Sequence, residues 1–568
     1  KTTKINDCEN FDETQLFNYV ELNDDGEQEM DKNYNHIIVE QGRYQKWLDA
    51  NFFSEHQEKK LPFTIIMPPP NVTGNLHIGH ALDTYLMDSI IRFKKLQGYD
   101  VLFLPGKDHA GIATQAKVEK KLLEQNITKY DLGREKFIEK IWEWKDDYSN
   151  NITKQWQKLG LFIDYNFERF TLDKQANEAV LAVFVKLYND GLIYRSSKPI
   201  NWDPKLKTAL SNIEVIPKPT EQKLYYIKYP LEDSSSYLLI ATTRPETMFS
   251  DVAIAINQED ERAEKLLNQT VIHPLTKRRI KIITSPLIDK NFGTGLMKVS
   301  AHAMDDIDII KQNNLEIIEC IDDNGLLNEK ANEFAGLDRF EARKKIIEFL
   351  QEGNLIEKIE DITSNVGYSE RSQVPIEILV RPQWFVKMDK LAEKLLLHFN
   401  NEDKVNFFPE RFADVLKKWM ENVNDWTISR QIWWGHRIPA WYKGNKILVQ
   451  INCPGEGWKQ DSDVLDTWFS SALSPFVFLG WPQTKKYLNR YFPTDLLVTG
   501  YDIIFFWVAR MYFQSLYFMN EKPFKNVLIH GLVRDEQGRK MSKSLGNGIN
   551  PIEIIDKYGS DVLRMSLI

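Results

Sequence analysis

The segment from Pro68 to Leu82, PPPNVTGNLHIGHAL, combines three prolines, two glycines and two histidines directly after the apolar run FTIIM. Prolines lack backbone N–H groups, so a strand over this run must end and the chain must leave the sheet there. A helix that begins near Leu76 would direct free N–H groups toward an anion and would place His77 and His80 on one face. Two such imidazoles can donate hydrogen bonds to phosphate oxygens as charge develops during phosphoryl transfer.

The histidine pair alone does not identify a site. An H-x-x-H pattern also occurs as two unrelated surface histidines, and it could form half of a zinc site. Asp108 and His109 could supply further ligands, but their spacing matches no metal-binding pattern. A second segment, Gly538 to Asn547 (GRKMSKSLGN), supports the phosphate interpretation because it places Lys540 and Lys543 among glycine and serine, although a solvated basic loop would look similar.

Composition indicates a multidomain globular protein. The 568 residues are 42% hydrophobic and 27% charged, and the length exceeds that of a typical single domain. We expect a cytoplasmic protein with no membrane partner, because no apolar stretch of spanning length lacks charges and the first ten residues show no targeting pattern. The three cysteines lie far apart, which argues against disulfides and a cysteine zinc site. A net charge of −8 argues against a general nucleic-acid coat, but a local basic face could still bind one RNA.

Alternating strand and helix patterns surround both segments. Apolar runs between Leu61 and Ser211, and again in TDLLVTGYDIIFFWVARMYF and KNVLIHGLV, favour an α/β fold whose parallel sheet is built from two separated parts of the chain. Between Ile213 and Asn365 the pattern changes to short β-type runs such as KLYYIKY, which predicts an inserted, strand-rich domain. Open α/β sheets bind ligands at the carboxyl ends of their strands, where the prolines place the histidine segment.

Both segments resemble the signatures of class I aminoacyl-tRNA synthetases. His77 to His80 reads HIGH and Lys540 to Ser544 reads KMSKS, and the chance of both occurring together is negligible. Further motifs look like those of the valyl-tRNA synthetases from about Tyr44 to Ile568: PPPNVTGNLHIGHAL, ATTRPETM, ISRQIWWGHRIPAWY, DVLDTWFSSAL, GYDIIFFWVARM and HGLVRDEQGRKMSKSLGN. The isoleucine and leucine enzymes are the nearest relatives of that branch and usually depart from PPPNVTG.

This resemblance implies a Rossmann-type parallel-sheet catalytic domain that is split by a strand-rich editing insertion. The expected parts are an N-terminal appendage (1–60), a first catalytic half (61–212), the editing insertion (213–365), a connective segment (366–460), a second catalytic half with the KMSKS loop (461–545) and the start of a helical stem-contact region (546–568). The chain begins without methionine and ends in a helix-like stretch, so we expect truncation before the anticodon-binding domain. A monomer is the expected state.

The resemblance also implies a reaction. Such enzymes join the valine carboxylate to the α-phosphate of ATP, release pyrophosphate and transfer the aminoacyl group to tRNA(Val). Catalysis then depends on positioning and electrostatics, with Mg²⁺ carried by ATP and no metal bound by the protein itself. By resemblance, His77 and His80 bind the ATP phosphates and Gly79 makes room for adenine. Lys543, assisted by Lys540, stabilises the departing pyrophosphate.

For the amino acid, the resemblance assigns Asn71 and Asp108 to the ammonium group. It assigns the walls around the isopropyl side chain to Pro68, Trp468, Ile503 and Trp507. A carboxylate suits an ammonium group, and rigid proline and tryptophan walls can exclude the additional methylene of isoleucine. Without the resemblance, the tryptophan and isoleucine walls could equally be ordinary core residues.

A pocket that fits valine cannot strongly reject threonine, for which the valine enzymes are themselves the known example, so the family carries an editing domain. The resemblance assigns to this domain Thr242, Thr243, Arg244, Lys298 and His302. In the family, an aspartate follows this histidine and binds the ammonium group of the wrong amino acid, whereas this chain has Ala303. We therefore expect weak or absent hydrolysis of threonyl-tRNA, unless Asp305 or Asp306 takes over through a local shift.

Two alternatives stay open at this point. If the protein is an enzyme, the alternative activity is isoleucine activation. If it is not an enzyme, the alternative is a catalytically idle paralogue that binds an amino acid or RNA, and the intact histidine and lysine motifs argue against this. The segment ISRQIWWGHRIPAWY interleaves basic and aromatic residues, as a contact with single-stranded RNA would require, but an interdomain packing surface is the favoured interpretation. Its basic and aromatic residues are Arg430, Trp433, Trp434, His436 and Arg437.

Overall fold

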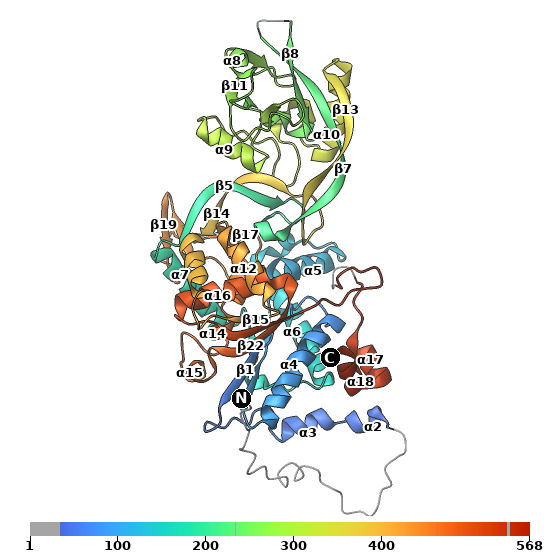
Figure 1. Cartoon of the computed structure of the whole chain (residues 1–568), viewed down its shortest axis with the longest axis vertical. Helices are drawn as coiled ribbons and strands as arrows, with labels where there is room; N and C mark the ends of the chain where they lie inside the picture. The colour runs from blue at the N-terminus through green and yellow to red at the C-terminus, as the bar shows by residue number, and fades with distance from the viewer. Residues whose placement is uncertain (1–33, 233–234, 542–545) are drawn as a thin grey trace, which may run out of the picture.

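The computed structural model describes residues 34–232, 235–541 and 546–568. Figure 1 shows an elongated molecule, with a strand-rich body at one end of the long axis and the N-terminal helices at the other. Within the described ranges, none of the helices combines the length and the apolar composition that crossing a membrane requires.

A five-stranded sheet forms the centre of the larger part of the molecule, and all of its neighbouring strands are parallel. Its order is β15 (Asn406–Phe408), β23 (Phe524–His530), β22 (Thr494–Gly500), β1 (Pro62–Ile66) and β2 (Asp100–Leu104). The predicted assembly of one parallel sheet from two separated parts of the chain is therefore confirmed. The sequence did not predict the edge strand β15, which comes from the segment between these two parts.

Helices cover both faces of this sheet, because its strands are apolar on both sides. Ile65 and Phe103 point into one core, beneath α4 (Ile78–Leu96) and α6 (Lys129–Lys158), whereas the adjacent Ile66 and Leu102 point into the other. That second core is covered by α7 (Lys174–Asn189), α11 (Asp389–His398) and α16 (Ala509–Phe518). The two-residue period of the strands thus divides their side chains between two cores.

Two long antiparallel ribbons lead from the sheet to the strand-rich body (Figure 1). The first ribbon pairs β5 (Ile193–Asp203) with β14 (Glu377–Val386), and the second pairs β7 (Val215–Pro230) with β13 (Ile356–Ser369). The predicted strand-rich insertion is therefore present. The expected boundary at residue 365 falls within β13, where no break marks it, and the domain limits stay predictions.

The body beyond the ribbons contains a four-stranded sheet and its covering helices. The sheet order is β10 (Thr270–Ile272), β11 (Arg279–Thr284), β9 (Ala253–Ile256) and β12 (Leu296–Val299). Beside it lie β8 (Tyr237–Thr242), which pairs with β7, and the helices α8 (Ala263–Leu266), α9 (Met304–Gln312) and α10 (Arg339–Glu352).

The two ends of the described chain pack on the same side of the central sheet. The N-terminal helices α2 (His36–Glu40) and α3 (Arg43–Asp49) lie near the C-terminal helices α17 (Pro551–Tyr558) and α18 (Ser560–Leu567) (Figure 1). The Glu40 carboxylate accepts a hydrogen bond from the Ser560 N–H at 2.7 Å, and this bond joins the two pairs of helices.

The shorter elements complete the connections. They are β3 (Gly106–Lys107), α5 (Gly111–Leu123), β4 (Arg169–Phe170), β6 (Thr208–Leu210), α12 (Arg411–Glu421), β16 (Trp426–Thr427), β17 (Ser429–Arg430), β18 (Ala440–Lys443), β19 (Lys446–Val449), β20 (Lys459–Gln460), β21 (Val464–Leu465), α13 (Thr467–Ser471), α14 (Ser474–Val477) and α15 (Leu488–Tyr491).

Candidate active site

The proline segment ends β1 as predicted, but the chain does not leave its neighbour completely. β1 stops at Ile66, two residues before the first proline. Beyond the prolines, the Asp108 N–H donates to the Pro70 carbonyl at 3.0 Å and the Val72 N–H donates to the Asp108 carbonyl at 3.2 Å. Proline lacks a donor but keeps its acceptor, so a single parallel bridge forms between Asn71 and Asp108. This bridge holds the two polar side chains next to each other.

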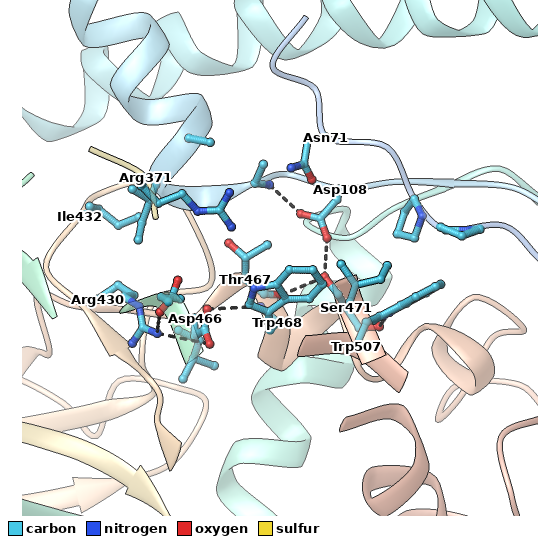
Figure 2. Close-up of a pocket in the computed structure, with 18 residues that line it drawn as sticks. Asn71, Asp108, Arg371, Arg430, Ile432, Asp466, Thr467, Trp468, Ser471 and Trp507 are labelled. Carbon is cyan, nitrogen blue, oxygen red and sulfur yellow. Dashed lines mark hydrogen bonds and ion pairs between the residues drawn. The ribbon is translucent and has the colours of Figure 1, made fainter. Parts of the chain in front are cut away.

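A cavity of about 80 Å³ opens beyond the carboxyl ends of β1, β2 and β22 (Figure 2). All the residues that the resemblance assigned to the amino acid line this one cavity: Pro68, Asn71, Asp108, Trp468, Ile503 and Trp507. They come from four separate parts of the chain, at positions 68–71, 108, 468 and 503–507. The structure therefore brings them together, and their roles toward a ligand stay predictions.

Asp108 is the polar centre of the cavity. Its carboxylate accepts a hydrogen bond from the Ala110 N–H at 2.7 Å and another from the Ser471 hydroxyl. Burial raises the pKa of this carboxyl to about 6, although both hydrogen bonds and the positive charge of Arg371 oppose that rise. The backbone of Ala110 adopts a left-handed conformation, with φ of 46°, directly before α5. The group is therefore ionised at neutral pH and remains close to its titration range.

Two tryptophans form the apolar wall. Trp468 lies in α13, whose first N–H groups are capped by the side chain of Asp466. Trp507 lies in a π-helical turn, η6 (Ile504–Val508), and its indole N–H donates to the Ser471 carbonyl at 2.9 Å. π-Helical turns are rare and occur frequently at functional sites. The hydrogen bond holds the ring in place, so the wall has a definite shape.

A group of charged residues beside the cavity was not predicted. Arg430 has only 1% of its side chain exposed, and it donates to Glu214 at 2.9 Å and lies 3.4 Å from Asp466. Arg510 also pairs with Asp466, at 3.3 Å. Glu214 and Arg371 stand at the two ends of the insertion and line the same cavity. No short-range spacing in the sequence could have connected them with the prolines.

The RNA contact considered for the segment ISRQIWWGHRIPAWY is wrong for three of its residues, for which the favoured packing interpretation holds. Arg430, Trp434 and His436 are buried, with 1%, 1% and 0% of their surface exposed. The Trp434 indole donates to the His109 carbonyl at 2.8 Å, and the His436 Nδ1 lies 2.8 Å from the Asn177 side chain. An RNA cannot reach such side chains, so this segment packs one part of the protein against another. Only Arg437 of the set is largely exposed.

The two histidines of the HIGH segment adopt a different arrangement from the one predicted. His77 is the N-cap residue of α4, not a member of its first turn, and its Nδ1 accepts from the Gly79 N–H at 3.1 Å. The His80 Nδ1 accepts in turn from the His77 N–H at 3.1 Å, and the two ring centroids are 4.0 Å apart. The Ile78 N–H donates to the Ile549 carbonyl at 2.9 Å. The free N–H groups predicted for an anion are therefore used inside the protein.

Gly79 lies so close to the His77 ring that a larger residue would not fit. A Cβ atom at this position would lie 2.9 Å from the His77 ring, so only glycine leaves space for that imidazole. Gly548 makes a similar approach, because a Cβ there would lie 3.0 Å from the Cβ of His77. The role of Gly79 toward adenine stays a prediction.

The first lysine of the KMSKS segment contacts the helical turn that follows β22, η5 (Tyr501–Ile503). Lys540 forms an ion pair with Asp502, and half of its side chain is exposed, at 50%. Lys543 lies outside the described residues. Near this pair, the His530 Nε2 is 3.0 Å from the Asp83 carboxylate and connects β23 to α4, a contact that the sequence did not predict.

The residues assigned to editing separate into two groups in the inserted body. Thr243 and Arg244 line a groove of about 890 Å³ between the ribbon β7–β13 and α10. The Arg244 guanidinium donates to the Glu377 carboxylate at 2.7 and 2.8 Å, to Glu246 at 3.1 Å and to the His302 carbonyl at 3.1 Å. These carboxylates raise the pKa of Arg244 despite its burial. Its side chain is therefore already fully engaged by the protein.

The other group is buried. The Lys298 ammonium donates to the Thr247 hydroxyl at 2.7 Å and pairs with Asp251 at 3.0 Å. The His302 Nδ1 lies 3.0 Å from the Ile378 carbonyl, and its Nε2 accepts from the Cys320 N–H at 3.0 Å, so both ring nitrogens bind backbone groups. His302 therefore fixes the loop before α9 to β14. Thr242, which ends β8, accepts from the Arg244 N–H at 3.0 Å.

Ala303 occupies the N-cap position of α9. Its side chain makes no capping hydrogen bond. Of the two following aspartates, Asp305 is exposed, whereas Asp306 is buried and accepts from the Ser300 N–H at 2.8 Å. An aspartate at position 303 would thus add two things at once: a helix cap and a negative charge.

The parallel sheet, the site at its carboxyl edge, and the HIGH and KMSKS segments together define a class I tRNA synthetase. A family model described as tRNA synthetases class I (I, L, M and V) matches residues 42–453 and 444–568, and the chain belongs to this family. Within it, valine--tRNA ligases are among the proteins that this chain resembles. That of Mycoplasmopsis pulmonis is 60% identical over 539 residues, which cover 95% of this chain and 65% of the relative. That of Streptococcus thermophilus is 56% identical over 544 residues, which cover 95% and 62%.

The chain thus spans somewhat less than two thirds of the length of these relatives. Among solved structures, the LeuRS of Agrobacterium radiobacter K84, in a ternary complex with tRNA and LeuAMS, resembles it with a TM-score of 0.53 at 18% sequence identity. The similarity covers 94% of this chain and 72% of that one, and it shows a shared fold. The predicted resemblance and fold class are confirmed.

Proposed function

We propose that this chain activates valine with ATP and transfers it to tRNA(Val). The observation that carries this function is the cavity at the carboxyl edge of the sheet, whose lining combines the polar Asn71 and Asp108 with apolar walls from Trp468, Ile503 and Trp507. The similarity to valine--tRNA ligases at 55–60% identity supports the choice of amino acid.

Each part of the cavity suits one part of valine. The Asp108 carboxylate is almost excluded from water, with 4% of its surface exposed, so a bound ammonium group would gain a strong charge-assisted hydrogen bond. The prolines and tryptophans present rigid apolar surface to the isopropyl group. A wall that cannot move rejects an additional methylene by overlap, which typically costs 1–3 kcal/mol.

The chemistry itself requires no protein nucleophile. A valine carboxylate oxygen attacks the α-phosphorus of ATP, the bond to the bridging oxygen breaks, and pyrophosphate leaves with the Mg²⁺ that ATP brings. We assign His77, His80 and Lys540 to the ATP phosphates, together with Lys543. Positioned hydrogen-bond donors and lysine cations of this kind act by stabilising charge that develops in the transition state.

Valine-dependent exchange of labelled pyrophosphate into ATP tests this function on the chain as it stands. Exchange with valine, and at least tenfold less with isoleucine at equal concentration, is expected. Preferential exchange with isoleucine would assign an isoleucine ligase, and no exchange with either amino acid would indicate a paralogue that binds without catalysis. Transfer to tRNA(Val) is measured separately, because it needs RNA contacts that exchange does not.

We further propose that the inserted body is an editing domain for threonyl-tRNA that Ala303 has weakened. The methyl side chain of Ala303 cannot bind an ammonium group. The neighbouring Asp306 is already committed to the Ser300 N–H, which leaves Asp305 as the exposed carboxylate of the pair.

Hydrolysis of threonyl-tRNA(Val) by the chain and two variants tests this assignment. Ala303→Asp restores both a cap and a charge, whereas Ala303→Asn restores only the cap, which is worth about 1 kcal/mol in each case. We expect deacylation by Ala303→Asp alone. If the unmodified chain deacylates as fast as Ala303→Asp, then position 303 is no lesion, and loss of Asp305 in a further variant would show whether that carboxylate replaces it.

A further inference from the structure

Arg371 lies in the turn that ends the insertion, yet it lines the amino-acid cavity. The turn connects β13, which ends at Ser369, to β14, which begins at Glu377. Figure 2 shows the Arg371 side chain entering the cavity beside Ile432, with its guanidinium directed toward Asp108. An insertion that carries a separate body at its far end therefore contributes a cation to the central site.

The turn holds this arginine in place. The Ser369 hydroxyl accepts hydrogen bonds from the N–H groups of Arg371 and Ser372, both at 3.2 Å, and Ser369 itself is fully buried. Glu370, which lies between Ser369 and Arg371, donates its N–H to the Glu214 carbonyl at 2.9 Å. Glu214 stands where the chain enters the insertion, so the entry and the return of the insertion are fastened together beside the cavity.

The other cation of the cavity lining, Arg430, is already neutralised. It is buried and pairs with Glu214 and Asp466 at 2.9 and 3.4 Å. Arg371 differs, because 30% of its side chain is exposed and its one ion pair among the described residues is with the adjacent Glu370, at 4.0 Å. Its guanidinium forms no hydrogen bond with any described residue. A guanidinium that faces a cavity and is only weakly paired has its N–H donors available for an incoming anion.

We propose that Arg371 binds the carboxylate of the amino acid while Asp108 binds its ammonium group. A zwitterion needs one partner of each sign, and the lining supplies Asp108 as the carboxylate and Arg371 as the cation that no acidic side chain neutralises closely. The planar fork of a guanidinium matches a carboxylate through two parallel hydrogen bonds. Arg371 is thus a substrate-binding residue that orients the carboxylate before it attacks ATP.

A consequence concerns the product of activation. When the carboxylate becomes the mixed anhydride of the adenylate, it loses its negative charge, and Arg371 loses its partner. The arginine therefore favours the free amino acid over the activated one at this contact. Because the turn that carries Arg371 directly follows β13, a displacement of the inserted body would alter amino-acid binding without moving the sheet.

Calorimetric titration with two ligands tests the assignment, which rests on the proposed function. Valine carries both charges, whereas isobutylamine has the same isopropyl and ammonium groups without the carboxylate. For Arg371→Gln we expect valine affinity to fall at least about tenfold, with isobutylamine affinity unchanged, because a charge-assisted hydrogen bond is lost. Arg371→Lys should recover part of the loss. The matched control is Arg381→Gln, on β14, whose side chain is similarly exposed at 25% but pairs with Glu319 and Asp323.

The outcomes separate the possibilities. Unchanged valine affinity in Arg371→Gln, or an equal loss for both ligands, would overturn the assignment, since the second result indicates a purely structural residue. Unchanged valine affinity together with reduced pyrophosphate exchange would instead assign Arg371 to a phosphate of ATP. A failure of the unmodified chain to bind valine at all would reject the proposed function itself, and the role of Arg371 with it.

Discussion

At the scale of single residues, Asp108 shows how the site combines two opposing demands. Burial raises its pKa to about 6, which disfavours the charge that ammonium binding requires, while hydrogen bonds from Ser471 and Ala110 restore part of that charge. The group therefore stays ionised at pH 7 with little margin. A bound ammonium group would add the missing stabilisation, so the cavity is prepared for a cation.

Amino-acid binding should therefore weaken in mild acid. Because the protonated form of Asp108 cannot pair with an ammonium group, valine affinity is expected to be constant above about pH 7 and to fall about tenfold for each pH unit below about 6. Titrations of valine between pH 5 and 8 measure this dependence. In Asp108→Asn the affinity should be low and independent of pH over the same range, and a variant that kept the acid limb would assign it to another group.

At the scale of elements, a histidine helps to fasten the segment before β1 to the sheet, beside Arg490, which donates to the carbonyls of Gln57, Glu58 and Lys60. The His56 ring lies between two carboxylates, with Nδ1 3.0 Å from Asp100 and Nε2 3.2 Å from Asp164. Burial opposes a charge on this ring, but hydrogen bonds to Asp164 and Asp100 outweigh it and raise the pKa of His56. Arg490 also pairs with Asp100, at 2.5 Å, so two cations share one carboxylate at the start of β2.

The contribution of His56 to stability should depend on pH. Its folded pKa lies above the unfolded value, so the contribution is complete below about pH 6.5 and is lost as pH rises through the folded pKa. We expect His56→Gln to lower the free energy of unfolding by about 1 kcal/mol at pH 6 and by less at pH 8.5, as measured by denaturant titration. A pH-independent loss in His56→Gln would refute the ionic account.

At the scale of the whole molecule, the inserted body is attached through a buried charge cluster at the base of β14. Glu377 has 1% of its side chain exposed and accepts from Arg244 at 2.7 Å and from Arg339 at 3.0 Å. These three residues belong to the end of the ribbon, the loop after β8 and the helix α10. The cluster therefore joins elements that the chain itself leaves separate.

Removing the charge of Glu377 should loosen the body and leave the sheet unaffected. Removing one member of a buried ion pair leaves the other charge buried without compensation, which typically costs about 3–5 kcal/mol. Glu377→Gln is therefore expected to speed amide hydrogen exchange in α10 and in the segment after β8. Exchange in β1, β2 and β22 should stay unchanged. Asp361→Asn, on the other ribbon (β7–β13) with 86% of its side chain exposed, serves as the control and should alter neither region. Uniformly faster exchange would show that the body and the sheet unfold as one unit.

The sequence by itself determined the parallel sheet and the end of β1 before its prolines, because these depend on local periodicity and on short motifs. Six of the residues that line the cavity followed from the family resemblance of such motifs, whereas its charged lining residues did not. Only the tertiary structure decided which polar side chains are sealed from solvent. Arg430 and Trp434 resemble an RNA-binding pattern in the sequence, yet both are buried, and Arg430 meets Glu214 from 216 residues away. Histidine is a residue type that often acts in catalysis, but both ring nitrogens of His302 bind backbone groups. Arg371 reaches the cavity only because the two ends of the insertion are fastened together there, and contacts over such separations leave no periodic trace in a single sequence.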